Sequence, residues 1–235
     1  MTKPEVHTIQ FGKPAWLAEC APTLTKWCQR YNYSLFKWDD SHGLPTPKLV
    51  VKKMLKKFLD GDSEQFIYVD ADVFVRPDAP AFPTAAGIAL ATDPWHQMHN
   101  EHFRNWAQEN CDLTAPPTWQ YRNAGVWTVN RAGAKSLLAA MNRIKFVEFF
   151  QEQHWFNACV IASKTPVVDL SSLWNRYGKD YEPSWFFHLW GNSKLEDLAY
   201  LRTTGLLTAL PKPPVPSPVE GGPAVLDEFQ RQDFP

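Results

Sequence analysis

The sequence has few of the features that would set a protein apart from ordinary globular domains. It has 4 cysteines in 235 residues and no Cys-x-x-Cys pair, which argues against a structural zinc site. It contains no run of about 18 apolar residues, so we expect no membrane-spanning helix. The first residues, MTKPEVHTIQF, include no apolar leader. We therefore expect a cytoplasmic protein whose thiols are reduced and mostly buried.

The chain also lacks a strong net charge. Its formal charge is −1 at pH 7, which gives no general electrostatic case for nucleic acid or a membrane surface. One local exception is a basic cluster on a predicted helix, formed by Lys48, Lys52, Lys53, Lys56 and Lys57. We include Lys52 among the candidate contacts for a bound nucleotide.

What is present favours one domain with a tail. A hydrophobic fraction of 44% supports a substantial core, and the length suits a single large domain. We place that domain at residues 1–210. Residues 211–235 begin with a proline-rich run, which predicts an extended tail.

Strands and helices alternate over the first 75 residues. Apolar periodicity predicts strands at 6–11, 33–36 and 66–69 and helices at 14–31 and 48–59. Pro22 would split the first helix or delay its start. The alternation predicts a doubly wound α/β sheet, in which ligands bind beyond the carboxyl ends of the strands. Gly12 follows the first strand and is either a close approach to nucleotide or an ordinary turn.

Two carboxylates end the most apolar strand. Asp70 and Asp72 follow Phe66-Ile67-Tyr68-Val69 directly, where ionised groups are costly unless their charge is offset. In an extended segment both side chains would point the same way. Carboxylate oxygens suit Mg²⁺ or Mn²⁺, so we predict a metal site here, although a pair of solvated aspartates in a turn would give the same tripeptide.

Two further stretches have the residue types of a binding site. Asn123-Ala124-Gly125 precedes a predicted strand, where small residues let a substrate approach the backbone. Glu152 and Gln153 open a predicted helix, and sequence alone leaves them equally as capping residues or active-site residues.

Two places in the sequence offer histidines as candidate metal ligands. His99 and His102 stand three residues apart and could share a helical face with a metal, but no third ligand is evident and a solvated helix is favoured. His188 ends an aromatic strand, and Gly191 and Lys194 follow it. Together these three fit a metal ligand, a close backbone approach and a phosphate contact better than a buried core histidine.

Taken in order, these stretches resemble glycosyltransferase family 8, the glycogenin and bacterial galactosyltransferase group. Its Asp-x-Asp strand is matched at 69–72, and its Phe-Asn-Ala-Gly-Val strand at 122–126, with Arg122 replacing the aromatic residue. Its Asp-Gln-Asp-x-x-Asn segment looks like residues 152–157. Its His-x-x-Gly-x-x-Lys-Pro ending matches at 188–195, with Leu195 in place of proline.

The resemblance implies a GT-A fold, in which a mostly parallel, Rossmann-like sheet is flanked by helices. It implies that Asp70, Asp72 and His188 hold Mn²⁺ or Mg²⁺ against the diphosphate of a nucleotide-sugar, with UDP the expected nucleotide. Lys194 and Gly191 would contact the diphosphate. The segment 123–125 would line the sugar, with Glu152 and Gln153 near its anomeric carbon. The acceptor would be a saccharide or glycoconjugate, and nucleic acid is disfavoured.

An amide is a poor nucleophile, so we expect transfer with retention through a front-face, ion-pair-like route. Double displacement through Glu152 is the alternative within the class. Two other classes compete with a transferase. One is a non-catalytic glycan- or nucleotide-binding module with the same fold. The other is a haloacid-dehalogenase-like phosphatase, which expects a small residue where Phe74 stands.

Overall fold

The computed structural model describes residues 2–39, 49–146, 152–176, 184–189, 191 and 193–207. The predicted proline-rich tail at 211–235 lies outside these residues. The elements in chain order are β1 (Glu5–Ile9), α1 (Ala15–Arg30), β2 (Ser34–Trp38), α2 (Val50–Asp60), β3 (Gln65–Val69), β4 (Val73–Val75), β5 (Ile88–Thr92), α3 (His96–Cys111), β6 (Arg122–Asn130), α4 (Arg131–Arg143), α5 (Glu152–Ser163), β7 (Val167–Asp169), the 3₁₀ turn η3 (Ser172–Trp174), β8 (Phe186–His188) and α6 (Lys194–Thr203).

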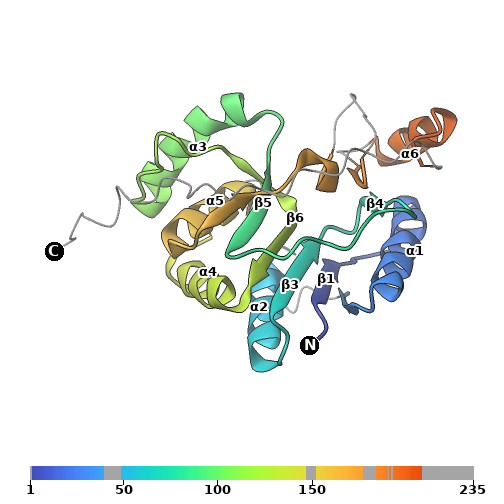
Figure 1. Ribbon diagram of the computed structural model, residues 1–235. Helices are drawn as coiled ribbons and strands as arrows, with labels where there is room; N and C mark the ends of the chain where they lie inside the picture. The colour runs from blue at the N-terminus through green and yellow to red at the C-terminus, as the bar shows by residue number, and fades with distance from the viewer. Residues whose placement is uncertain are drawn as a thin grey trace.

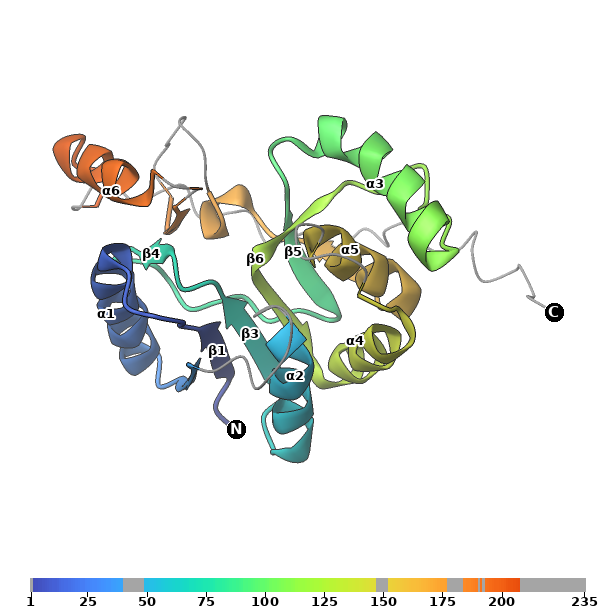
Figure 2. The same cartoon turned by 180° about the vertical axis from the view of Figure 1, so that it is seen from behind.

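The centre of the domain is a six-stranded sheet in the order β2-β1-β3-β6-β5-β7. Only β6 runs against the other five strands, because it pairs antiparallel with both β3 and β5. Helices α2, α4 and α5 cover one face and α1 covers the other (Figures 1 and 2). The described chain is therefore a single α/β domain with a mostly parallel sheet, as predicted.

Burial explains why the central strand was easy to recognise. All five residues of β3 are buried, because helices cover both faces of the sheet at this strand. A strand covered on both faces has an apolar run without alternation. Its antiparallel neighbour β6 extends past the carboxyl end of β3, since Val69 pairs with Val126 and β6 starts at Arg122. The carboxyl end of β3 and the small residues of 123–125 thus meet at one edge.

Helix α1 runs through Pro22 without a break, which corrects the expectation of a split or late start. The buried side chains Cys20, Leu24, Trp27 and Cys28 lie on the face opposite Pro22, which is exposed. Packing of that face holds the helix together although proline removes one backbone hydrogen bond.

One strand pairing and one helix of the structure were not predicted. The strands β4 and β8 form a separate antiparallel pair beside the main sheet, and α6 follows β8. A strand of three residues has little local signal. The partner of β4 also lies more than 110 residues away in sequence, since Val73 pairs with His188.

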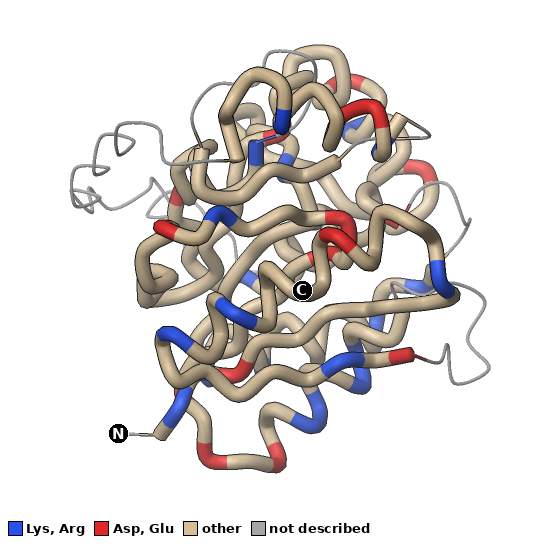
Figure 3. Tube along the Cα trace, turned by 90° about the vertical axis from the view of Figure 1, so that its right-hand side faces the viewer, with Lys and Arg blue, Asp and Glu red and all other residues tan. Residues whose placement is uncertain are grey.

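In the described ranges no helix is long and apolar enough to cross a membrane. Acidic and basic residues both occur across the trace (Figure 3).

Candidate metal centre

The two aspartates lie on a turn at the carboxyl end of β3. The backbone does not stay extended there, since the Val73 amide donates to the Asp70 carbonyl at 3.2 Å. This corrects the expectation that the pair would converge through strand alternation. Aspartate is favoured at the first position of such turns. The Asp70 amide also donates to the Gly125 carbonyl at 2.7 Å, which joins the turn to the start of β6.

Pairing of β4 with β8 brings His188 to this turn. Val73 is the antiparallel partner of His188. The chain is held on both sides, because the Leu189 amide donates to the Asp72 carbonyl at 3.0 Å and the His188 amide to the Arg176 carbonyl at 2.8 Å. A short strand therefore carries the imidazole across the sequence to the carboxylates.

One ligand atom from each of Asp70, Asp72 and His188 lies within 4.8 Å of the other two. The His188 Nε2 atom is 3.2 Å from Asp72 Oδ1 and 3.7 Å from Asp70 Oδ2. The side chains are 13–17% exposed, so the site is recessed yet open. Two hard carboxylates with one imidazole nitrogen are a suitable donor set for Mn²⁺ or Mg²⁺.

Gly125 makes room for this arrangement. A Cβ atom at Gly125 would lie 2.2 Å from Cε1 and 2.6 Å from Nδ1 of His188. The imidazole ring therefore packs directly on the backbone of β6. The glycine that sequence reasoning placed beside a sugar is in contact with the predicted metal ligand.

Lys194 also joins the site. It is the first residue of α6, and its ammonium group forms an ion pair with Asp72 Oδ2. Its Nζ atom lies 5.1 Å from the ring centroid of Trp16 on α1. Burial by itself would raise the pKa of Asp72, but His188 and Lys194 outweigh it and the pKa is lowered. Asp72 is thus held as a carboxylate.

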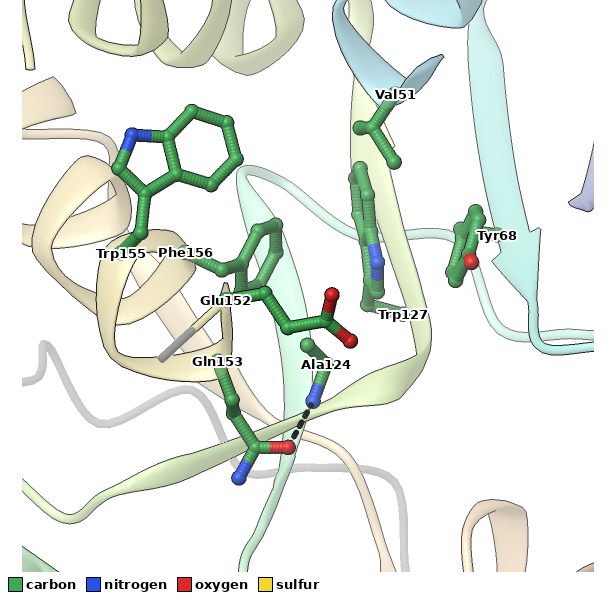
Figure 4. A pocket seen from close by; sticks show the side chains of 8 residues that line it. All are labelled: Val51, Tyr68, Ala124, Trp127, Glu152, Gln153, Trp155 and Phe156. Carbon is green, nitrogen blue, oxygen red and sulfur yellow. Dashed lines mark hydrogen bonds between the residues drawn. The ribbon is translucent and has the colours of Figure 1, made fainter. Parts of the chain in front are cut away.

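The predicted catalytic pair lies on the other side of β6. Glu152 and Gln153 open α5 and line a small pocket of about 40 Å³ together with Val51, Tyr68, Ala124, Trp127, Trp155 and Phe156. In Figure 4 the Glu152 carboxylate points into this pocket, and the Gln153 amide oxygen accepts from the Ala124 amide at 3.4 Å. Tyr68 connects the pocket to the metal site, because its hydroxyl donates to Asp70 Oδ1 at 2.5 Å.

The histidines of α3 form part of a polar cluster beside α5. His154 Nε2 lies 3.0 Å from His102 Nδ1, and the Tyr121 hydroxyl lies 2.5 Å from His154 Nδ1. His99 instead faces Asp93, with 3.4 Å between its Nδ1 and Asp93 Oδ1. Within the described residues, His99 and His102 belong to no group of three potential metal ligands.

The other three predicted site residues lie at three different places in the fold. Gly12 is an exposed glycine with φ of 67° after β1. Gly191 has φ of 57°, and nothing lies within 4 Å of a Cβ built on it. Lys52 on α2 stands 5.5 Å from the Trp155 ring centroid, beside the pocket of α5.

Sequence reasoning missed two residues that hold the site together. Asn175, buried after η3, bridges His188 and Asn123 by side-chain hydrogen bonds. Asp93, buried after β5, accepts from Gln153 Nε2 at 3.1 Å. The only signal for Asp93 in the sequence is its place directly after the apolar run that forms β5, and Asn175 has none.

Comparison with known proteins gives structural neighbours without sequence relatives. No family model matches the sequence, and no curated protein matches it. The crystal structure of a glycosyltransferase involved in the glycosylation of the major capsid of PBCV-1 matches with a TM-score of 0.55 and 15% identity, over 83% of this chain and 100% of that chain. The apo form of mouse xyloside xylosyltransferase 1 matches with a TM-score of 0.49 and 12% identity, over 81% of this chain and 98% of that chain.

The first likeness shows that the chain has a glycosyltransferase fold, which confirms the predicted fold class. Membership of glycosyltransferase family 8 stays a prediction.

Proposed function

We propose that this protein is a metal-dependent glycosyltransferase. It would move a sugar from a nucleotide-sugar, with UDP the expected nucleotide, to a saccharide or glycoconjugate acceptor. The observation that carries the proposal is the convergence of Asp70, Asp72 and His188 at the carboxyl edge of the sheet.

The free cysteines of the described chain fit a reducing compartment, so we assign the protein to the cytoplasm.

The donor set and its surroundings fit a divalent cation. Three ligand atoms lie close together, His188 and Lys194 keep Asp72 ionised against the effect of burial, and Gly125 leaves the space that His188 occupies. Bound Mn²⁺ or Mg²⁺ would offset the negative charge that the diphosphate gains as the glycosidic bond breaks.

Lys194 is suited to bind the same diphosphate. It stands at the amino end of α6, where backbone amides and the helix dipole also favour an anion. The ammonium group now paired with Asp72 would turn to the phosphate oxygens. The Gly191 backbone, Gly12 and Lys52 remain candidate contacts for the rest of the nucleotide-sugar.

Sugar transfer would take place beside Ala124, between the metal site and α5. Gln153 lies there with its amide oxygen on the backbone of β6 and its amide nitrogen on Asp93. An amide held at both ends can orient a sugar and stabilise positive charge near the anomeric carbon. This supports a front-face route with retention, in which the acceptor attacks as the diphosphate leaves.

Replacement of Glu152 separates this route from double displacement. We expect Glu152→Gln to keep donor turnover within about tenfold of the wild type, because no covalent bond to the carboxylate is needed. A loss of about 10⁴-fold or more, with a trapped glycosyl-enzyme in a mass spectrum, would instead support nucleophilic attack by Glu152.

Thermal unfolding with UDP and Mn²⁺ tests the function itself. We expect UDP to raise Tm only when Mn²⁺ is present, because the cation joins the diphosphate to the carboxylates. Asp72→Asn should abolish this effect, whereas Asp62→Asn, at an exposed position after α2, should leave it unchanged.

Two other responses would point to the competing classes. Stabilisation by orthophosphate analogues would favour a phosphatase, and a response to sugars alone would favour a binding module. Donor hydrolysis across a panel of nucleotide-sugars then identifies the sugar.

A further inference from the structure

A chain of side-chain hydrogen bonds leads from the backbone of β6 to the far nitrogen of His188. The Gly125 amide donates to Asn123 Oδ1 at 2.7 Å. Asn175 Nδ2 donates to the same oxygen at 2.6 Å. Asn175 Oδ1 lies 3.0 Å from His188 Nδ1. Asn123 and Asn175 are buried, with 6% and 3% of their surface exposed, so water does not compete for these groups.

The donors and acceptors in this series of hydrogen bonds can be assigned in only one way. A backbone amide can only donate, so the atom of Asn123 that faces Gly125 must be its carbonyl oxygen. That oxygen can only accept, so Asn175 must present its amide nitrogen to it. The remaining oxygen of Asn175 then faces His188 and requires a proton on Nδ1.

The geometry points to Asn175 as a positioning residue that holds His188 in the Nδ1-protonated form. The Nε2 lone pair of His188 then faces the candidate cation site, on the side where Asp70 and Asp72 lie. This inference rests on the proposed function, because it assigns a role within the same metal site. Asn123 is reassigned with it, from a sugar contact to the group that orients Asn175.

The other end of Asn123 extends the network toward the sugar side. Its Nδ2 atom lies 3.4 Å from Gln153 Oε1, and Gln153 Nε2 donates to Asp93 at 3.1 Å. Asn123 thus joins the residue that holds the metal ligand to the residue proposed beside the anomeric carbon. Partners of metal-bound histidines typically change metal affinity by about 10- to 100-fold when removed.

The first test uses the metal-free wild-type protein. Long-range ¹H–¹⁵N correlation spectra of ¹⁵N-histidine protein, recorded at alkaline pH, distinguish the two neutral tautomers, and His188→Gln assigns the signal. We expect the Nδ1-protonated tautomer for His188. The Nε2-protonated tautomer would overturn the inference, and this readout requires neither metal binding nor turnover.

The second test measures Mn²⁺ affinity by electron paramagnetic resonance. We expect Asn175→Ala to weaken binding by about 10- to 100-fold and to shift His188 toward the other tautomer. Asn175→Asp keeps an oxygen toward Nδ1 but sets its second oxygen against Asn123 Oδ1, so we expect it to recover only part of the affinity. The exposed Asn105→Ala on α3 is the matched control and should change nothing.

The failure of each proposal has a different signature. Unchanged tautomer and Mn²⁺ affinity in Asn175→Ala would overturn the positioning role while the transferase proposal stands. A wild-type protein that binds no Mn²⁺ would overturn the proposed function, and the tautomer of the metal-free protein would still decide the role of Asn175.

Discussion

At the scale of single residues, Gly125 shows how the absence of a side chain shapes the site. Its position in β6 is extended and buried, where most side chains would fit a strand well. Here the imidazole of His188 occupies the volume that a Cβ would need, at 2.2 Å. Glycine is therefore required because the imidazole ring lies so close to the backbone, and not because the backbone conformation excludes other residues.

Gly125→Ala should displace His188 from the carboxylates. We expect Mn²⁺ affinity to fall at least about tenfold. The new methyl group pushes the imidazole of His188 out of place, and a metal–ligand distance can change by only about 0.2 Å. Isothermal titration with Mn²⁺ measures the effect. Gly61→Ala is the control, because the nearest atom to its Cβ is the end of the Glu5 side chain at 3.3 Å. Equal affinity of the Gly125 variant and the wild type would show that His188 does not bind the cation.

His154 provides a pH dependence away from the metal site. Burial, followed by the charges of His102 and His99, lowers its pKa from 6.5 to about 4. The folded protein keeps this ring neutral, and unfolding allows it to take up a proton below its ordinary pKa. The stability that depends on neutral His154 is therefore complete above about pH 6.5 and is lost as pH falls toward 4.

The comparison of wild type with His154→Gln isolates this group from the carboxylates. We expect the free energy of unfolding of the wild type to fall by about 1–2 kcal/mol more than that of the variant between pH 7 and 4, a value reduced for partial exposure of the ring. Urea unfolding at several pH values measures it. Parallel pH profiles for the two proteins would contradict the assignment.

At the scale of elements, α4 is a helix whose bounds were predictable. Between its ends, Arg131 and Arg143, buried residues recur at helical spacing. Asn130 caps the helix, since its side-chain oxygen accepts from the Gly133 amide at 2.8 Å. Its amide nitrogen also donates to the Ala86 carbonyl at 2.8 Å. Local signals of this kind do not depend on the rest of the fold.

Asn130→Ala removes both hydrogen bonds of that cap. We expect a loss of about 1–2 kcal/mol in the free energy of unfolding, measured by urea denaturation. Asn142→Ala, at an exposed position in the last turn of the same helix, is the matched control and should be near neutral. A similar loss in both variants would show that the loss at Asn130 is not due to its cap.

At the scale of the whole molecule, the part of the chain that the structure describes packs into three apolar clusters, and each contains one buried cysteine. Cys159 lies in the cluster under α2, α4 and α5. Cys28 lies in the cluster under α1. Cys20 lies in a small cluster between α1, β8 and α6, which holds six buried side chains. Burial raises the pKa of Cys20 and of Cys28 to about 12, so neither thiol reacts in the folded protein.

Thiol labelling in increasing urea should therefore report the three clusters separately. We expect the partly exposed Cys111 to react without urea and Cys20 to react at a lower urea concentration than Cys28 and Cys159. The reason is that only the cluster of Cys20 opens when α6 separates from α1. Mass spectrometry of labelled peptides gives the order. Simultaneous reaction of all three buried thiols would show that α6 unfolds only with the whole domain.

The sequence by itself determined the elements of the main sheet and the residue types that stand at their ends. Helix and strand periods, the buried strand before Asp70 and the fold class all follow from local residue patterns, because burial of one face imposes a period on the chain. Only the tertiary structure decided how the site is assembled. The pairing of β4 with β8, the contact of His188 with Gly125 and the bridge through Asn175 join residues far apart in sequence. No local pattern records such contacts, since they depend on which distant segments the folded core brings together.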